Sequence, residues 1–225
     1  MATTSNVGIN PKRVPELETA ISKSLKTFSD TIKTEIERNI ITKASNTWFT
    51  PNGVKFFEDF NTRVKELESP MLENYNIFIK TMETAANYAL ERAGASTVNF
   101  NKVSDCDLAV NVSNIKAEKS DGSIAIDLGA MPALASATST ARTNITTKAK
   151  TLSTNISQIA AAVFQGNDQS TVIKDCFDRL NDVIAGFFKT LDEGENTLKG
   201  AIEKAATEVG YTTDEVKKTF NSLSS

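Results

Sequence analysis

The stretch Asn46-Thr47-Trp48-Phe49-Thr50-Pro51-Asn52-Gly53 decides the fold, because a run with helical spacing lies on each side of it. It contains the only tryptophan of the chain and a Pro-Asn-Gly turn signal. Before it, apolar residues recur every three or four positions, at Leu17, Ile21, Leu25, Phe28, Ile32, Ile36 and Ile40. After it, they recur in the same way, at Phe57, Phe60, Val64, Leu67, Met71, Tyr75, Phe78, Met82, Ala85 and Ala89. This spacing places each set on one helix face, so the stretch predicts the bend of a helical hairpin over residues 14–96.

Two residues predict the shape of the second helix of this hairpin. Pro70 removes one backbone hydrogen bond and crowds the preceding turn, so we expect a kink near Glu66–Pro70. Gly94 is the residue at which we expect the helix to end. A polar arm over residues 1–13 precedes the hairpin.

The second half of the chain repeats this plan over residues 132–210. Two helical runs are separated by Phe164-Gln165-Gly166-Asn167-Asp168, which predicts a second bend. We expect Gly210 to end the later run in the left-handed conformation. The segment Thr212-Thr213-Asp214-Glu215 has the pattern of a capping box, so it predicts a short helix within residues 211–225.

Residues 97–131 differ from both halves, because their apolar residues alternate with polar ones. The alternation involves Leu108, Val110 and Val112 and, further on, Ile124, Ile126 and Leu128. Between these two groups lies Asp121-Gly122, a strong hairpin turn signal. The pattern predicts a β-hairpin that pairs residues 108–118 with 123–128, with room for a further short strand near 98–103.

Four amphipathic helices follow from these patterns. Each would expose an apolar stripe if it stood alone in water, so we expect the stripes to be buried together. The sequence therefore predicts a mainly α protein: an antiparallel four-helix bundle of two long helical hairpins, with a small β-hairpin between them.

The composition argues against several classes of function. The 225 residues include no histidine, which removes Ser-His-Asp and Cys-His catalysis and histidine metal ligands. No carboxylate cluster or phosphate-binding glycine loop stands out, so we expect no enzymatic activity, no cofactor, no metal site and no small-molecule substrate. Lys+Arg number 25 and Asp+Glu 28, a net charge of −3, and no basic stripe predicts nucleic-acid binding. We expect protein partners, which include further copies of the chain or a larger assembly.

The two cysteines occur in dissimilar contexts. Cys106 is flanked by Asp105 and Asp107, a pattern better explained by a solvated loop than by a metal site. Cys106 and Cys176 either pair or remain two small buried side chains, and their contexts favour the second alternative.

Nothing in the sequence predicts a membrane anchor. The segment Met1-Ala2-Thr3-Thr4-Ser5-Asn6 lacks a basic region followed by an apolar run, so we expect no cleavable signal peptide. No apolar run approaches the roughly 18 residues that a membrane-spanning helix needs. Residues 124–135 are apolar enough to suggest a helical pore-former with a β-tongue. Charged residues near its tip argue against deep insertion, so we expect no membrane contact.

The two bends resemble those of the WXG proteins exported by type VII secretion. That family has a helical hairpin with Trp-x-Gly at its bend, which Trp48 and Gly53 resemble although four residues separate them here. The run Val54-Lys55-Phe56-Phe57-Glu58-Asp59-Phe60 is similar to the aromatic-rich helix after that motif. The second bend has the family's spacing, with Phe164 in place of tryptophan before Gly166.

Past the second hairpin, Tyr211 and Glu215 look like the Tyr-x-x-x-Asp/Glu export signal of the same family. The resemblance covers residues 14–93 and 134–216. It implies a non-enzymatic protein that is secreted without a cleavable signal peptide and that acts through protein–protein contacts. The family builds its bundle from two separate hairpins, whereas here one chain would supply both. The bend residues and the export signal are its implied binding residues.

A second hypothesis is a structural subunit of a phage particle or another large assembly, located in the virion. The polar N-terminal arm and the richness in Thr, Ser and Asn favour it.

Overall fold

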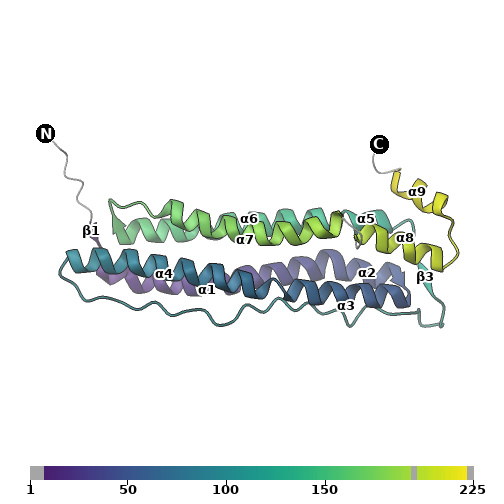
Figure 1. Cartoon of the computed structure of the whole chain (residues 1–225), viewed down its shortest axis with the longest axis horizontal. Coiled ribbons are helices and arrows are strands. Elements are labelled where there is room, and N and C mark those ends of the chain that lie inside the picture. Colours follow the sequence, from purple (N-terminus) through teal and green to yellow (C-terminus); the bar gives the residue numbers. More distant parts are fainter. Residues whose placement is uncertain (1–7, 194–196, 222–225) are drawn as a thin grey trace. The chain divides into compact units, whose positions relative to one another are not determined.

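The computed structural model describes residues 8–193 and 197–221, and it is mainly helical, as predicted (Figure 1). Its helices are α1 (Val14–Ile36), α2 (Thr42–Thr47), α3 (Pro51–Lys65), α4 (Glu68–Arg92), α5 (Met131–Ala135), α6 (Ala137–Val163), α7 (Ser170–Asp192), α8 (Leu198–Glu208) and α9 (Thr213–Asn221). A 3₁₀ turn, η1 (Pro11–Arg13), precedes α1, and a π-helical turn, η2 (Glu37–Ile41), joins α1 to α2. Four strands of two residues each are β1 (Gly8–Ile9), β2 (Trp48–Phe49), β3 (Ala125–Ile126) and β4 (Phe164–Gln165).

The described residues form two compact units. Unit 1 contains residues 8–31, 68–107 and 146–183. Unit 2 contains residues 32–67, 108–145, 184–193 and 197–221. Each unit therefore takes helices from both halves of the chain.

Unit 1 has an aromatic core contributed by α1, α4 and α7. The ring of Phe177 lies 6.4 Å from the ring of Phe28 and 6.4 Å from that of Tyr75, both in edge-to-face contact. The Tyr75 hydroxyl donates to the carbonyl of Ile21 at 2.7 Å and is hydrogen-bonded to the Ser24 hydroxyl. These bonds join α4 to α1, and Figure 1 shows the two helices side by side. Burial raises the pKa of Tyr75 far above its usual range, so its proton stays in place.

In unit 1, a two-stranded sheet connects the start of the described chain to the second of the two predicted bends, at Phe164. β1 pairs antiparallel with β4, with Gly8 opposite Gln165 and Ile9 opposite Phe164. The N–H of Asn10 extends this pairing by donating to the carbonyl of Val163 at 2.8 Å.

Unit 2 has a second aromatic core, between α3 and the end of α7. Phe57 and Phe60 lie one turn apart on α3, and the Phe60 ring contacts that of Phe187 at 5.5 Å. Arg63 lies over the Phe187 ring at 5.9 Å and donates to the Thr190 hydroxyl. The apolar stripe predicted for residues 57–64 is therefore buried.

The kink predicted near Glu66–Pro70 is a break between two helices, so its position is right and the expectation of one continuous helix is wrong. Glu66 and Leu67 separate α3 from α4, so two helices replace one kinked helix. Pro70 lies in the first turn of α4, where its missing N–H leaves no helical hydrogen bond unmade. Gly94 and Gly210 both have the left-handed conformation predicted for helix ends, with φ of +68° and +94°.

The predicted β-hairpin that pairs residues 108–118 with 123–128 is wrong, although its turn forms. Gly122 has φ +79°, and the N–H of Lys119 donates to the carbonyl of Ser123 at 2.8 Å. The two flanks pair with β2 and not with each other. Phe49 lies opposite Ala125 of the antiparallel β3 and also forms a parallel bridge with Lys116. β2 therefore lies between Lys116 and β3. Further along the first flank, side chains take the place of a strand: the N–H of Val110 donates to Oδ1 of Asn61 at 2.9 Å, and that of Asn111 to Oε1 of Glu37 at 2.8 Å.

Candidate functional site

The Trp48 indole fills the interior of the first bend, between α2 and α3. The ring is fully buried, and its Nε1 donates to the Thr50 hydroxyl at 2.8 Å. That hydroxyl also caps α3, because it accepts a hydrogen bond from the N–H of Gly53 at 3.0 Å. One buried threonine thus connects the tryptophan to the first turn of the next helix.

Gly53 lies directly against the indole. A Cβ atom at this position would lie 2.7 Å from Nε1 and 2.8 Å from Cδ1 of Trp48. The indole is also stacked with the Phe56 ring, with centroids 5.8 Å apart, and is in edge-to-face contact with the Phe57 ring, with centroids 5.6 Å apart. The structure therefore brings Trp48 and Gly53 together, but in the protein interior. Their part in binding a partner stays a prediction.

The second bend is built differently. Phe164 is buried in β4, and Gly166 turns the chain with φ +80°. The two residues lie in the same turn in unit 1, where the ladder with β1 holds the bend in place of a tryptophan–glycine contact.

The predicted export signal lies at the start of α9 in unit 2. The carboxylate of Glu215 accepts hydrogen bonds from the N–H and hydroxyl of Thr212 at 2.7 and 2.8 Å. The Thr212 hydroxyl accepts one from the N–H of Glu215 at 3.3 Å, so the predicted capping box is confirmed. These bonds lower the pKa of Glu215. Tyr211 is 37% exposed, so its ring is available at the surface.

The outer face of α4 is a surface that the sequence analysis missed. Ile77 and Tyr88 on this helix are 51% and 58% exposed, and such side chains are informative where they lie together on one face. They are eleven residues apart, about three helical turns, so they point the same way. Together with Thr81, Thr84, Ala85, Lys80 and Asn167 they line an open groove of about 700 Å³.

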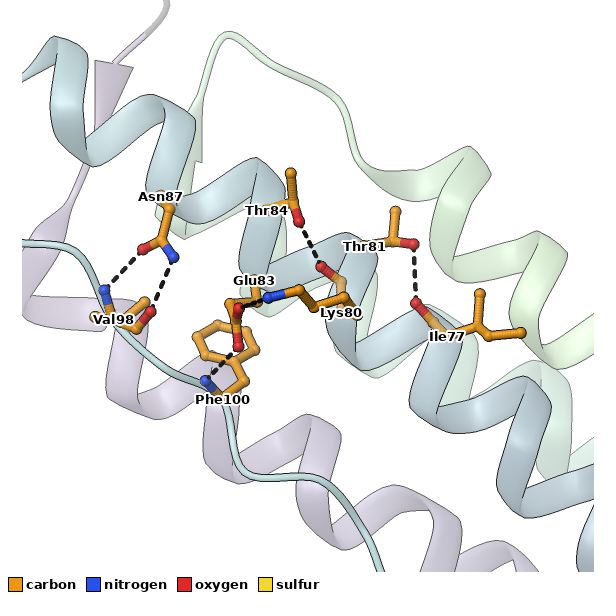
Figure 2. A network of polar contacts seen from close by, with 8 residues as sticks. All are labelled: Ile77, Lys80, Thr81, Glu83, Thr84, Asn87, Val98 and Phe100. Carbon is orange, nitrogen blue, oxygen red and sulfur yellow. Dashed lines mark hydrogen bonds and ion pairs between the residues drawn. The ribbon is translucent and has the colours of Figure 1, made fainter.

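The two threonines make this face more apolar than its sequence indicates. The Thr81 hydroxyl donates to the carbonyl of Ile77 at 2.9 Å, and the Thr84 hydroxyl donates to that of Lys80 at 2.8 Å (Figure 2). Because each hydroxyl is already hydrogen-bonded within α4, the threonine methyl groups form the part of these side chains that is available for apolar contact. We name the outward set Ile77, Thr81, Thr84 and Tyr88 the α4 stripe.

An extended segment, residues 98–103, lies along the neighbouring side of α4. Asn87 pairs with both backbone groups of Val98: its Oδ1 accepts from the N–H at 2.7 Å, and its Nδ2 donates to the carbonyl at 2.8 Å (Figure 2). Asn76 pairs in the same way with Val103, at 3.0 and 2.9 Å. The segment is thus held by side chains that lie beside the α4 stripe and do not belong to it.

Glu83 anchors the middle of this segment. Its buried carboxylate accepts from the N–H of Phe100 at 2.9 Å and is paired with the ammonium group of Lys80 (Figure 2). The hydrogen bond from Lys80, with that from Phe100, lowers the pKa of Glu83. The carboxylate is fully engaged in holding the chain, which explains its burial without a catalytic role.

The described residues offer little else for chemistry. Cys106 and Cys176 are buried and free, which confirms the second alternative above, and burial raises the pKa of each thiol to about 12. Within residues 8–193 and 197–221, no three Cys, Asp or Glu side chains are grouped so that they could hold a metal ion. No described helix has the length and apolar character needed to cross a membrane.

No protein-family model matches the chain, and no curated protein or solved structure is significantly similar to it. A functional assignment therefore depends on the bend, the export-signal residues and the α4 stripe.

Proposed function

We propose that this chain is a non-enzymatic WXG-like protein, in which two helical hairpins are fused into one four-helix bundle. It is secreted without a cleavable signal peptide and acts through protein–protein contacts. The observation that carries the proposal is the contact between the Trp48 indole and Gly53, which joins two helices at a tight bend. Because the indole occupies the space of a side chain at position 53, the bend needs a glycine opposite the tryptophan. This requirement supports the likeness to the Trp-x-Gly bend, although Trp48 and Gly53 are further apart in sequence than in that motif.

The exposed side chains support the remaining parts of the proposal. Tyr211 is exposed, and four residues later the carboxylate of Glu215 is held by the capping box, so both groups of the proposed export signal lie together at the start of α9. The α4 stripe supplies an apolar surface for a protein partner.

The test is export from a bacterium with an active type VII secretion apparatus, measured by immunoblotting of medium and cells. We expect the parent chain in the medium and several-fold less of the Tyr211→Ala variant. Glu215→Gln can still accept the hydrogen bonds of the capping box, so it separates the charge from the helix cap. We expect Glu215→Gln to lower export and Tyr211→Phe to retain most of it, with unchanged thermal midpoints. Equal export of all variants would refute the signal, and retention of the parent chain would refute secretion.

The α4 stripe also favours a second candidate, a structural subunit of a phage particle or other large assembly. Such a subunit would form large polymers at high concentration, which sedimentation velocity would detect. A species of one or two chains at all concentrations would count against it.

A further inference from the structure

The α4 stripe has the same spacing when it is read from either end. Its members follow one another by four, three and four residues, with large apolar side chains at the ends and threonines in the middle. This is the spacing of the a and d positions of a coiled coil. In an antiparallel pair of such helices, an a position of one helix faces a d position of the other.

We propose that the α4 stripe docks on the α4 stripe of a second copy of this chain, antiparallel and around a two-fold axis. In this register Ile77 faces Tyr88 of the second copy, and Thr81 faces Thr84. The inference rests on the proposed function, in which the α4 stripe binds a protein partner, and it identifies that partner as a second copy of the chain. Because both copies use the same patch, the assembly closes at two chains.

The charges at the two ends of α4 fit this orientation. Glu73 is exposed one turn before the stripe, and Arg92 is exposed one turn after it. An antiparallel pair brings Glu73 to the level of Arg92 of the second copy, whereas a parallel pair would bring like charges together. Arg92 is already positioned, because it donates to the Tyr88 hydroxyl at 2.6 Å and lies 5.4 Å from the centre of that ring.

Segment 98–103 leaves the stripe open on its side of α4, and Asn167 lines the other side of the groove. The extended segment 98–103 is bonded to Asn76, Glu83 and Asn87, and none of these belongs to the stripe. The contact would run from residue 73 to residue 92, about 28 Å of helix at 1.5 Å per residue. One helix pair of this length lies at the low end of the area that stable interfaces bury, so the dimer is expected to dissociate in the micromolar range.

Sedimentation equilibrium of the full chain tests the inference over concentrations from about 1 to about 100 μM. We expect a monomer–dimer equilibrium for the parent. Ile77→Lys and Tyr88→Lys each place a charge in the contact, so each should raise the Kd at least tenfold. Ile124→Lys is the matched control, because Ile124 is 48% exposed and lies outside α4. An unchanged Kd in both α4 variants, or a parent that stays monomeric, would overturn the inference.

Disulfide trapping tests the register. Thr81→Cys mixed with Thr84→Cys should form a cross-linked dimer several-fold faster than either variant alone, because only the mixture places two new thiols opposite each other. The native cysteines are buried, so background oxidation is slow. Equal rates in all three samples would refute the antiparallel register, and polymers larger than two chains would refute closure. A parent chain that is exported normally but stays monomeric would overturn this inference and leave the secretion proposal intact.

Discussion

Replacing Gly53 with alanine should destabilise the protein, although helix propensity predicts the opposite. Gly53 is the third residue of α3, and its φ is not in the left-handed region. Alanine in a helix is normally more stable than glycine by about 0.5–1 kcal/mol. The close contact with Trp48 reverses this expectation, so the sign of the effect tests whether the indole is held in place.

The magnitude follows from the distances. The new Cβ would lie 2.7, 2.8 and 3.0 Å from three atoms of the Trp48 ring, well inside normal contact. The ring is held by its hydrogen bond to Thr50 and by Phe56 and Phe57, so it cannot move away without cost. Overpacking of this kind costs about 1–3 kcal/mol. After the helix-propensity gain is subtracted, we expect a net loss of up to about 2.5 kcal/mol, centred near about 1 kcal/mol, or roughly 2–4 °C in Tm at the centre of the range for a chain of this size.

Urea unfolding followed by circular dichroism measures this loss. Gly186→Ala is the matched control, because Gly186 lies inside α7 with no atom within 4 Å of a Cβ added there, so it should gain about 0.5–1 kcal/mol. In a Trp48→Ala background the clash is gone, so Gly53→Ala should also become stabilising. A Gly53→Ala variant as stable as Gly186→Ala would refute the reasoning.

Three further changes test other contacts. Trp48→Ala empties a fully buried ring site and should cost about 3–5 kcal/mol in urea unfolding; a midpoint within the error of the parent would contradict the burial. Tyr75→Phe removes the hydroxyl bonded to Ile21 and Ser24, but the Ser24 hydroxyl lies 2.9 Å from the Ile21 carbonyl and can then donate to it, so we expect a loss of only about 1 kcal/mol. A loss as large as that of Trp48→Ala would contradict this estimate. The pKa of Glu83 is lower in the folded protein than its unfolded value of 4.5. The ionised carboxylate therefore stabilises the fold at pH values above 4.5, and this stabilisation is lost as the pH falls through the folded pKa. The stability deficit of Glu83→Gln should therefore be larger at pH 7 than at pH 3, and an equal deficit at both would show that the charge contributes nothing.

The sequence predicted the helices well, because their signals are local. The apolar spacing of α1, the irregularity near Pro70 and the helix ends at Gly94 and Gly210 each depend on residues within one or two helical turns. The capping box at Thr212 is of the same kind. The burial of Trp48 against Gly53 could be suspected from the bend, but the shared threonine was visible only in the structure.

The β-hairpin was mispredicted because strand pairing is decided by distant residues. Asp121-Gly122 correctly predicted a turn, and the alternation on each side was real. Phe49 lies 67 residues before Lys116 and 76 residues before Ala125, yet it pairs with both. A local pattern cannot reveal such a competitor, since a strand of two residues leaves almost no periodic signal.

The α4 stripe was missed for a different reason. The apolar spacing of the inner face accounted for most large residues of α4, so Ile77 and Tyr88 had no separate pattern to join. The threonines between them read as polar, and only their bonds to the helix carbonyls make them part of an apolar surface.

The attachment of segment 98–103 shows what a sequence signal for such a connection would be. A side-chain amide carries one donor and one acceptor, so a single asparagine can pair with both backbone groups of an extended residue. Asn76 and Asn87 are eleven residues apart on α4, which spans about 16.5 Å at 1.5 Å per residue. Their partners Val103 and Val98 are five residues apart, which also spans about 16.5 Å at 3.3 Å per residue of extended chain. The equal lengths, with the residue order reversed, allow the segment to run straight back along the helix that precedes it. Residues 98–103 therefore need no neighbouring strand, because Asn76 and Asn87 make the hydrogen bonds that a strand would otherwise make.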